Sequence, residues 1–311
     1  DSDCLISVVI PARNESATIG RCLESVREQL GVHEPVEIIV ADNQSTDGTG
    51  AIAASYGAGV VVSHASSVAG VRNDGVRHTT GEILLFLDAD CFLGKGWKAA
   101  FDAQRERLLQ PVGAILGSHP YPPPGEDVFL WRYWFFPYVR RQSASHVGSA
   151  HLVCSRSTFE SLNGFNEHLK TGEDYDICQR LISRGGEIVV ERSLVAFHDG
   201  YPRHLLDFVR REMWHGVGDV SSIRSIAQSR VALAGLLFLG SLCLALASLA
   251  LGWTALALSA VATSVIVAVA SAVARFKGYP IRVAVVASVC ILPLYLIARG
   301  AAVAVRLKHW K

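Results

Sequence analysis

The chain has 311 residues, a length that predicts about two structural units. Its 29 Lys and Arg nearly balance 28 Asp and Glu, so nothing in the charge suggests a nucleic-acid partner. Hydrophobic residues make up 50% and charged residues 18%, and this apolar excess lies in the C-terminal part of the chain.

The cysteines and the N-terminal residues indicate a reducing compartment. The seven cysteines are an odd number and form no C-x-x-C pair, which disfavours a disulfide framework or a zinc site. Charged Asp1 and Asp3 lead directly into an apolar run at residues 6–10 without a signal-peptide pattern. We therefore expect the polar part of the chain to face the cytosol.

Strand and helix patterns alternate along the first 120 residues. Apolar runs predict strands at residues 6–10, 36–41, 60–63 and 83–87. Helical spacing over residues 19–30, with Asn14 or Ser16 as the cap, and two further helical stretches before residue 78 fill the intervals. This order predicts an α/β fold with a mainly parallel sheet and flanking helices.

Polar, acid-rich loops follow three of these strands, at residues 11–15, 42–48 and 88–90. Any one of them could be a turn or a helix cap. Ligands of parallel sheets bind beyond the carboxyl ends of the strands, where all three loops should meet. The three loops together therefore predict a binding edge.

Asp88 and Asp90 follow the buried strand at residues 83–87 with one residue between them. Two carboxylates this close repel each other unless a cation neutralises them. Oxygen ligands favour Mg²⁺ or Mn²⁺, which in turn hold substrate phosphates. The pair therefore predicts a divalent metal at the binding edge.

An ordered set of motifs resembles the family 2 glycosyltransferases, which have the GT-A fold. The set consists of Val9-Ile10-Pro11-Ala12-Arg13-Asn14-Glu15, Asp42 with Ser45-Thr46-Asp47-Gly48-Thr49, Arg72-Asn73-Asp74-Gly75, Asp88-Ala89-Asp90 and Gly172-Glu173-Asp174. The motifs cover about the first 200 residues. Each motif alone is unspecific, whereas their order is specific.

The resemblance implies a role for each matching position. Residues expected to bind a nucleotide-sugar donor are Pro11, Ala12, Arg13, Asn14, Glu15, Asp42, Arg72, Asp88, Ala89 and Asp90. Asp88, Asp90 and His198 are the expected metal ligands, Asp174 the expected catalytic base, and His151, Glu173 and Trp214 the expected acceptor-side residues. Two simpler interpretations stay open, namely that His198 is structural and that His151 faces solvent.

Asp174 is also supported by its local pattern. Residues 173–176 open a helix whose inward face is expected to hold Ile177, Leu181 and Ile182. Acidic residues favour a helix N-terminus for dipole reasons alone, so a structural role stays open. A single carboxylate suffices as the base of an inverting transfer, because it only accepts a proton from the nucleophile.

Residues 231–274 contain no charged side chain, which is long enough for two membrane crossings. We expect a glycosyltransferase domain at residues 1–225, with an interfacial helix near 203–217, and a membrane anchor at 226–311. The anchor should hold two or three apolar helices at about 231–251, 254–274 and 283–305. A pair of buried core helices is the alternative.

Basic residues flanking the apolar helices predict the orientation. Arg224, Arg230, Arg275, Lys277 and Arg282 all belong on the cytoplasmic side by the positive-inside rule. The basic tail after residue 305 breaks that rule if the third helix, kinked by Pro293, crosses fully. An interfacial or re-entrant third helix is the alternative. The aromatic stretch at 130–138 suits either a membrane surface or core packing.

The expected function is non-processive, inverting hexosyl transfer from a UDP- or GDP-sugar to a lipid or lipid-linked glycan at the cytoplasmic face of the inner membrane. Processive relatives carry Q/R-x-x-R-W, whereas this chain has Met213 at the position of the second arginine. One alternative is a polyprenyl-phosphate sugar synthase. Another is a catalytically silent, nucleotide-sugar-binding subunit of a polysaccharide export complex. No motif identifies a protein partner.

Overall fold

The computed structural model describes residues 5–31, 36–136, 146–220 and 222–308. The chain divides into two compact units. The sheet unit comprises Asp1–Glu126 and Gln142–Gly200, and the helical unit comprises Asp127–Arg141 and Tyr201–Lys311. This division differs from the boundary expected at residue 225, because residues 201–225 and the aromatic stretch belong to the helical unit.

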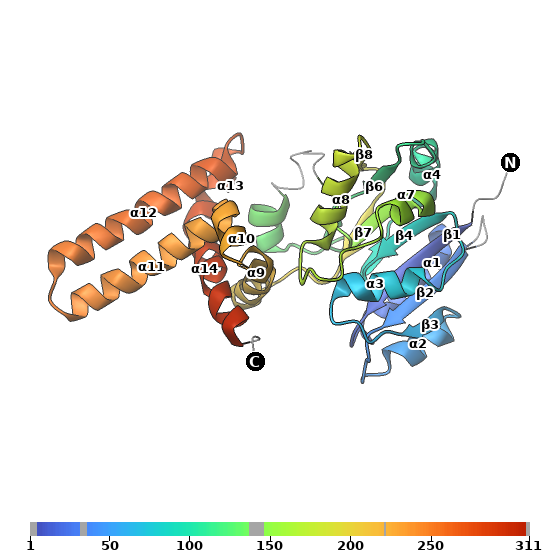
Figure 1. The fold of residues 1–311 in the computed structure, drawn as a ribbon, viewed down its shortest axis with the longest axis horizontal. Coiled ribbons are helices and arrows are strands. Elements are labelled where there is room, and N and C mark those ends of the chain that lie inside the picture. Colours follow the sequence, from blue (N-terminus) through green and yellow to red (C-terminus); the bar gives the residue numbers. More distant parts are fainter. Residues whose placement is uncertain (1–4, 32–35, 137–145, 221, 309–311) are drawn as a thin grey trace. The chain divides into compact units, whose positions relative to one another are not determined.

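Within the described residues, the sheet unit is built on a seven-stranded sheet with the order β3-β2-β1-β4-β7-β6-β8 (Figure 1). The strands are β1 (Ile6–Ala12), β2 (Val36–Asp42), β3 (Gly59–Val62), β4 (Ile83–Leu87), β6 (Ala114–Gly117), β7 (His151–Ser155) and β8 (Glu187–Val190). The first four strands run parallel, and β7 alone is antiparallel to its neighbours. The predicted α/β fold with a mainly parallel sheet is confirmed.

Helices cover both faces of this sheet (Figure 1). They are α1 (Ile19–Gln29), α2 (Thr49–Ser55), α3 (Val68–Val76), α4 (Trp97–Asp102), α5 (Arg105–Leu108), α7 (Arg156–Ser161) and α8 (Glu173–Ser183). Along β1, Val8 and Ile10 join the core beneath α1, while Val9 joins the core beneath α3 and α8. Apolar contacts on both faces explain why β1 is a continuous apolar run.

Two local predictions within this unit are wrong. Helix α1 begins after Thr18, which makes no side-chain cap bond, so neither Asn14 nor Ser16 is the cap. Ile182 is 40% exposed, and the buried face of α8 is instead made by Ile177, Cys178 and Leu181.

The helical unit contains three helices that are long and apolar enough to cross a membrane within the described residues, at Arg230–Ala250, Thr254–Phe276 and Ile281–Arg306. Its elements are η1 (Trp131–Phe135), α9 (Leu205–Asp219), α10 (Ile223–Gln228), α11 (Arg230–Ala250), α12 (Thr254–Phe276), α13 (Ile281–Val286), η2 (Ala287–Ile291) and α14 (Leu292–Lys308). Helices α11 and α12 meet at Gly252, which has φ +74°. This agrees with the two apolar helices expected at about 231–251 and 254–274.

The third apolar helix is longer than the sequence indicated. It runs as α13, η2 and α14, with the π-helical turn directly before Pro293. Proline lacks the N–H that an α-helix needs and crowds the carbonyl of the preceding turn. A π-helical turn is a common way to absorb such an irregularity.

The aromatic stretch packs inside the helical unit. Trp134 of η1 is buried and packs against Tyr295 with a centroid separation of 4.8 Å and an angle of 51° between the rings. The Arg275 guanidinium lies 3.9 Å from the centroid of the Trp134 ring, and Phe208 of α9 meets Trp134 edge-on. Core packing therefore holds for the buried members of the stretch, Leu130, Trp131 and Trp134, whereas Phe136 is 39% exposed.

Glycines let α11 and α14 approach closely. A Cβ on Gly235 would lie 2.7 Å from the backbone nitrogen of Gly300. We therefore expect Gly235→Ala to destabilise the helical unit by about 1–3 kcal/mol, because the helices must separate. Gly240→Ala on the same helix is the matched control, since a Cβ there meets nothing within 4 Å. Apparent melting temperatures should fall for the first variant and hold or rise for the second.

Candidate active site

The loops after β1 and β2 interlock through side-chain bonds to backbone. Asn14 has φ +57°, a conformation that asparagine tolerates better than most residues. Its Oδ1 accepts from the backbone nitrogen of Thr46 at 2.9 Å, and its own nitrogen donates to Ser45 Oγ at 2.9 Å. The nitrogen of Glu15 donates to Thr49 Oγ1 at 2.8 Å. Two of the predicted polar loops thus form one rigid edge.

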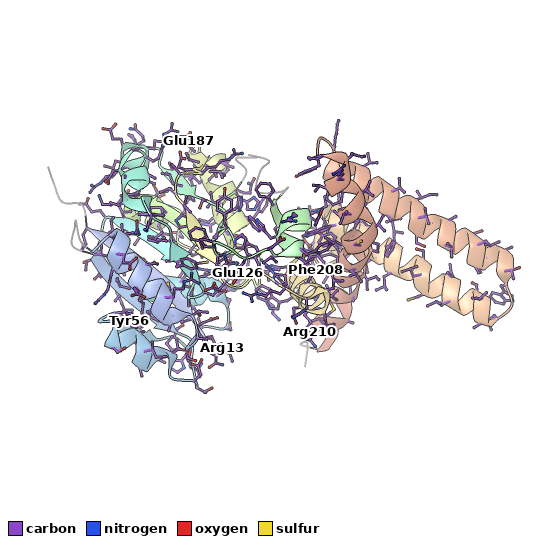
Figure 2. The ribbon with its side chains drawn as sticks, turned by 180° about the vertical axis from the view of Figure 1, so that it is seen from behind. Arg13, Tyr56, Glu126, Glu187, Phe208 and Arg210 are labelled. Carbon is purple, nitrogen blue, oxygen red and sulfur yellow. The ribbon has the colours of Figure 1, made fainter. Side chains whose placement is uncertain are left out.

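Asp42 closes this edge at the end of β2. It is 9% exposed, and its Oδ1 accepts from the nitrogen of Ser45 at 3.0 Å. Pro11 is half-buried and Ala12 is buried, whereas Arg13 is exposed (Figure 2). The residues expected to line a nucleoside pocket therefore share one edge, and their contact with a donor stays a prediction.

Arg72 links the strand that carries Asp88 to the helix that carries Glu173. Its Nη2 donates to Asp88 Oδ1 at 2.6 Å and its Nη1 donates to Glu173 Oε1 at 2.9 Å. The arginine is 2% exposed. Burial by itself lowers the pKa of the Arg72 guanidinium. The negative charges of Asp88 and then Glu173 outweigh this effect, so the net pKa is raised and the guanidinium stays charged.

These contacts give two predicted site residues a structural role. Each terminal nitrogen of Arg72 bonds one carboxylate, so Arg72 shapes the site. Glu173 is 6% exposed and also accepts from Ser149 Oγ at 3.0 Å. The donor role of Arg72 and the acceptor role of Glu173 stay predictions.

Asp90 and His198 come together through a small second sheet formed by β5 (Cys91–Leu93) and β9 (Ala196–His198). Cys91 pairs with His198 across these strands. This register brings Asp90 Oδ2 within 2.9 Å of His198 Nε2, and both side chains remain partly exposed. Asp88 is not in the group of close ligand atoms that these residues form with Cys91, and one of its oxygens accepts from Arg72; its role as a metal ligand stays a prediction.

The Asp90–His198 pair fits a divalent metal. A Cβ on Gly200 would lie 2.3 Å from Asp90 Oδ2 and 2.8 Å from His198 Nε2, so a side chain at this position would collide with both atoms. Cys91 lies in the same cluster. Burial, followed by Asp88 and Asp90, raises the pKa of its thiol well above the usual value.

Negative charge accumulates at this edge. Burial raises the pKa of the Glu15 carboxyl, and the charges of Asp90, Asp88 and Asp47 raise it further, against a hydrogen bond from Thr18. A site whose carboxylates disfavour each other's ionisation has a place for a cation. This electrostatic property, which includes the charges of Asp88 and Asp90, agrees with the metal prediction.

Asp174 is the second residue of α8, whose N-terminal cap Gly172 has φ +83°. Its Oδ1 accepts from the nitrogen of Tyr175 at 2.7 Å, and its Oδ2 accepts a long 3.4 Å bond from the nitrogen of Ser149. The carboxylate is half-buried. It is thus held by backbone groups while part of it remains accessible.

The residues around Asp174 include two histidines that the sequence analysis missed. The charges of His146 and Asp174 both act on the pKa of His119, and Tyr175 packs against His146. The direction of strand β6 is the signal by which His119 could have been found. Strand β6 runs parallel to β4, because both are antiparallel to β7, so His119 follows a strand end at the same edge.

His151 is a further correction. It is 0% exposed, receives a bond from Trp97 Nε1 at 2.7 Å on its Nε2, and lies 2.9 Å from Ser118 Oγ through its Nδ1. Burial lowers its pKa to about 3. It neither contacts an acceptor nor faces solvent, because it is a neutral, hydrogen-bonded core residue.

Trp214 belongs to α9 of the helical unit, where it is 51% exposed. Leu205 and Leu206 on the same helix are also exposed, and Glu212 is paired with Arg299 of α14 at 2.9 Å. This pattern suits a helix with one apolar surface. Its interfacial role and the acceptor role of Trp214 stay predictions.

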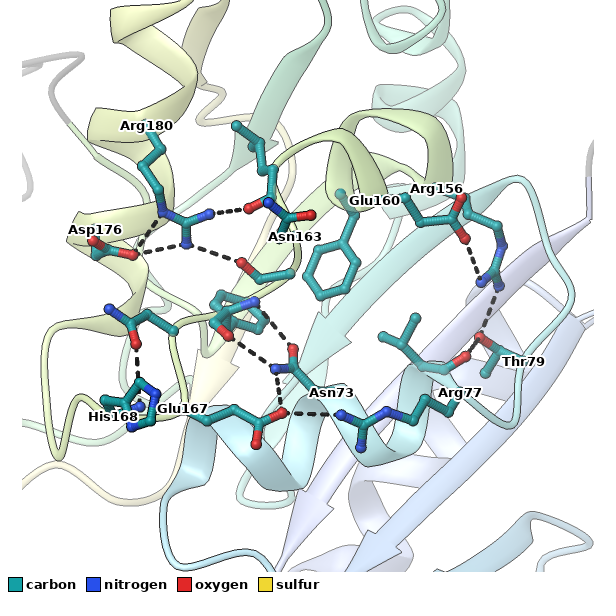
Figure 3. A pocket seen from close by; sticks show the side chains of 16 residues that line it. Asn73, Arg77, Thr79, Arg156, Glu160, Asn163, Glu167, His168, Asp176 and Arg180 are labelled. Atoms are coloured by element: carbon teal, nitrogen blue, oxygen red, sulfur yellow. Dashed lines mark hydrogen bonds and ion pairs between the residues drawn. The ribbon is translucent and has the colours of Figure 1, made fainter.

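A pocket of about 850 Å³ lies elsewhere in the sheet unit, between α3, α7 and α8 (Figure 3). Its arginines are engaged by the protein: Arg77 with Glu167, Arg180 with Asp176 and Arg156 with Glu160. The predicted catalytic and metal residues are not among those that line it.

Comparisons with known proteins agree with this geometry. A family model described as glycosyl transferase family 2 matches residues 7–158. The chain is 28% identical over 224 residues to the pre-mycofactocin glycosyltransferase of Mycobacterium tuberculosis, covering 68% of this chain and 46% of that protein. It is 26% identical over 212 residues to glycosyltransferase AglE of Haloferax volcanii, covering 63% and 67% of the two chains. The chain thus spans about half the length of the first of these relatives.

One solved structure shares the fold along nearly the whole chain. It is mannosyltransferase PcManGT of Pyrobaculum calidifontis in complex with GDP-Man and Mn²⁺, with a TM-score of 0.62 and 20% identity. The match covers 98% of this chain and 88% of that one. The similarity confirms the GT-A fold expected from the sequence.

Proposed function

Residues 7–158 form a family 2 glycosyltransferase domain, and from this premise we propose what the chain transfers and where. It moves one sugar per encounter, with inversion, from a UDP- or GDP-sugar to a lipid or lipid-linked glycan. The reaction takes place at the cytoplasmic face of the inner membrane, where the three apolar helices anchor the chain. The PcManGT complex with GDP-Man and Mn²⁺ supports a nucleotide-sugar donor and a divalent metal.

The observation that carries this proposal is the Asp90–His198 pair beside a strand-end edge. The two side chains meet at 2.9 Å, and Gly200 leaves space at both ligand atoms. A carboxylate and an imidazole suit Mn²⁺, and the carboxylate suits Mg²⁺ equally. When bound there, the metal ion neutralises charge on the diphosphate leaving group.

The chain's own residues perform the remaining tasks. The edge made by Asn14, Glu15 and Asp42 holds the nucleoside. Arg72 fixes Asp88 through its 2.6 Å bond, so that Asp88 faces the ribose and diphosphate in one orientation. Asp174 accepts the proton of the acceptor hydroxyl while that oxygen bonds to the anomeric carbon and the nucleoside diphosphate leaves.

The test is thermal stability of the detergent-purified protein against UDP- and GDP-sugars, with Mn²⁺ and with EDTA. A ligand that binds only the folded state raises the melting temperature. We expect a shift with one nucleotide class that EDTA abolishes. If no donor gives a shift, the silent-subunit hypothesis also fails, since it requires nucleotide-sugar binding, and the acidic edge is structural.

Gly200→Ala tests the metal site without changing a ligand. The added Cβ would strike both Asp90 Oδ2 and His198 Nε2, so it separates them or occupies the metal position. We expect the Mn²⁺-dependent donor shift to disappear while the melting temperature without ligand changes little, since Gly200 is exposed. Gly240→Ala should keep the shift. A normal shift in Gly200→Ala would mean that the metal, if bound, lies elsewhere.

A further inference from the structure

A ring cluster lies beside the proposed base, and neither the donor nor the metal accounts for it. The rings of His119 and His146 are 6.3 Å apart between centroids and nearly perpendicular, at 73°. The His146 and Tyr175 rings are 5.7 Å apart at 72°. We call His119, His146 and Tyr175 the ring cluster. All three residues belong to the sheet unit.

Three separate segments converge to build the ring cluster around Asp174. His119 follows β6, His146 precedes β7, and Tyr175 follows Asp174 on α8. Residues next to His146 reach the base directly: a Cβ on Gly148 would lie 3.7 Å from Asp174 Oδ2, and the nitrogen of Ser149 donates to the same atom at 3.4 Å. A group bound against the ring cluster is therefore adjacent to the carboxylate.

Exposure makes the ring cluster accessible. Tyr175 is 53% exposed, although it is a large aromatic residue, and His119 and His146 are half-buried. A tyrosine ring that packs on one side and is open on the other provides a stacking surface. The apolar C–H face of a pyranose ring suits such a surface, while imidazole and phenol groups can bond its hydroxyls.

The charge of the ring cluster disfavours a phosphate. Burial, followed by His146, lowers the pKa of His119 to about 4, while Asp174 opposes them, so His119 is neutral at physiological pH. Among the described residues, the groups that shift His119 do not include Lys or Arg. Arg72, the nearby buried cation, already bridges Asp88 and Glu173. Phosphate binding favours arginine forks or lysine, and the Asp174 carboxylate repels a dianion.

We infer that the ring cluster is the acceptor subsite and that it binds an uncharged sugar residue, one of whose hydroxyls it presents to Asp174. This inference rests on the proposed function. Within that function it selects a sugar hydroxyl of a glycolipid or lipid-linked glycan as nucleophile, and it disfavours a polyprenyl phosphate. The hydroxyl oxygen bonds to the anomeric carbon, its proton passes to Asp174, and the nucleoside diphosphate departs with the bonding pair.

The experiment compares acceptor probes using the nucleotide sugar that gives the metal-dependent thermal shift. The probes are n-octyl β-glucoside, n-octyl α-mannoside and farnesyl phosphate, with the protein in a detergent that has no sugar headgroup. We expect transfer to at least one octyl glycoside and none to farnesyl phosphate. Transfer to farnesyl phosphate alone, or to none of the probes, overturns the inference.

Substitutions in the ring cluster test whether its side chains bind the acceptor sugar. Tyr175→Ala and His146→Ala should each raise KM for the octyl glycoside about tenfold, the effect of losing one ring contact, with the donor-induced thermal shift unchanged. Tyr175→Phe should retain most of the affinity, because the ring remains. His168→Ala, an exposed histidine of the same unit, is the matched control. Unchanged KM in both ring variants overturns the inference.

The experiments distinguish failure of the acceptor assignment from failure of the proposed function. If the wild-type protein shows the metal-dependent donor shift but transfers nothing to an octyl glycoside, only the acceptor assignment fails. If no donor shift occurs, the proposed function fails and takes the acceptor assignment with it.

Discussion

Asp174→Asn should lower the rate of sugar transfer by about 10²–10⁴-fold, the range for losing a positioned general base. The amide keeps the shape of the carboxylate and can still accept from the nitrogen of Tyr175, which donates to Asp174 at 2.7 Å. It cannot take a proton from the acceptor hydroxyl. The donor-induced thermal shift should therefore be unchanged, and single-turnover transfer of labelled sugar measures the rate.

Asp176→Asn is the matched control for this prediction. It lies on the same helix, where its carboxylate pairs with Arg180 at 2.7 Å and lines the pocket away from the acidic edge (Figure 3). A partly exposed pair of this kind contributes only about 0.3–0.5 kcal/mol. The rate should remain close to wild type. Equal losses of transfer rate in the two variants would indicate a general effect of charge on α8. Retained turnover in Asp174→Asn would show that Asp174 is not the base.

The central parallel strands β1 and β4 were predictable because they are buried on both faces. Ile6 to Ile10 and Ile83 to Leu87 are buried throughout, so the sequence shows unbroken apolar runs that end where polar loops begin. The carboxyl ends of parallel strands must share an edge. The convergence of Asn14, Asp42 and Asp90 therefore follows from local patterns alone.

The partners of charged residues were not predictable in the same way. Arg72 and Glu173 are 101 positions apart, and no local periodicity indicates that they share one buried ion pair. His151 starts β7, yet whether it faces the core or the edge depends on Trp97 and Ser118. A role assigned from a family motif assumes that the side chain is exposed to a ligand. Whether it is exposed depends on how segments distant in the sequence pack around it.

The boundary between the units shows a related limit. Hydropathy located α11 and α12, because residues 231–274 lack charge. It could not assign α9 or the aromatic stretch to the helical unit, because Phe208 and Trp134 are buried by packing against each other and against the apolar helices. Amphipathic segments look alike whether lipid or protein covers their apolar surface.

Arg72→Met should produce the largest loss of stability among these variants. Methionine fills similar apolar space but leaves Asp88 and Glu173 without their shared cation, and Glu173 has only 8% of its side chain exposed. Removing one partner of a buried ion pair costs about 3–5 kcal/mol. For a unit of this size, each kcal/mol lowers the melting temperature by about 2–4 °C.

Arg77→Met is the matched control on the adjoining turn after α3. Its guanidinium is 59% exposed and pairs with Glu167 at 3.0 Å, so its loss should cost less than about 1 kcal/mol. Arg72→Lys separates charge from geometry, because a single ammonium group cannot reproduce the fork that reaches two carboxylates. We expect partial recovery of the melting temperature and a weakened donor shift, because Asp88 is no longer fixed.

Adding Glu173→Gln to the Arg72→Met variant completes a double-mutant cycle for the Arg72–Glu173 pair. Once the cation is gone, removing the buried carboxylate should restore stability, since no charge remains uncompensated at that position. Additive losses would mean that the two residues act independently and that Arg72 stabilises the site through Asp88 alone. Stability could instead recover while donor binding does not. That result would show that the Arg72–Glu173 contact stabilises the fold and that the Arg72–Asp88 contact orients Asp88 for the donor.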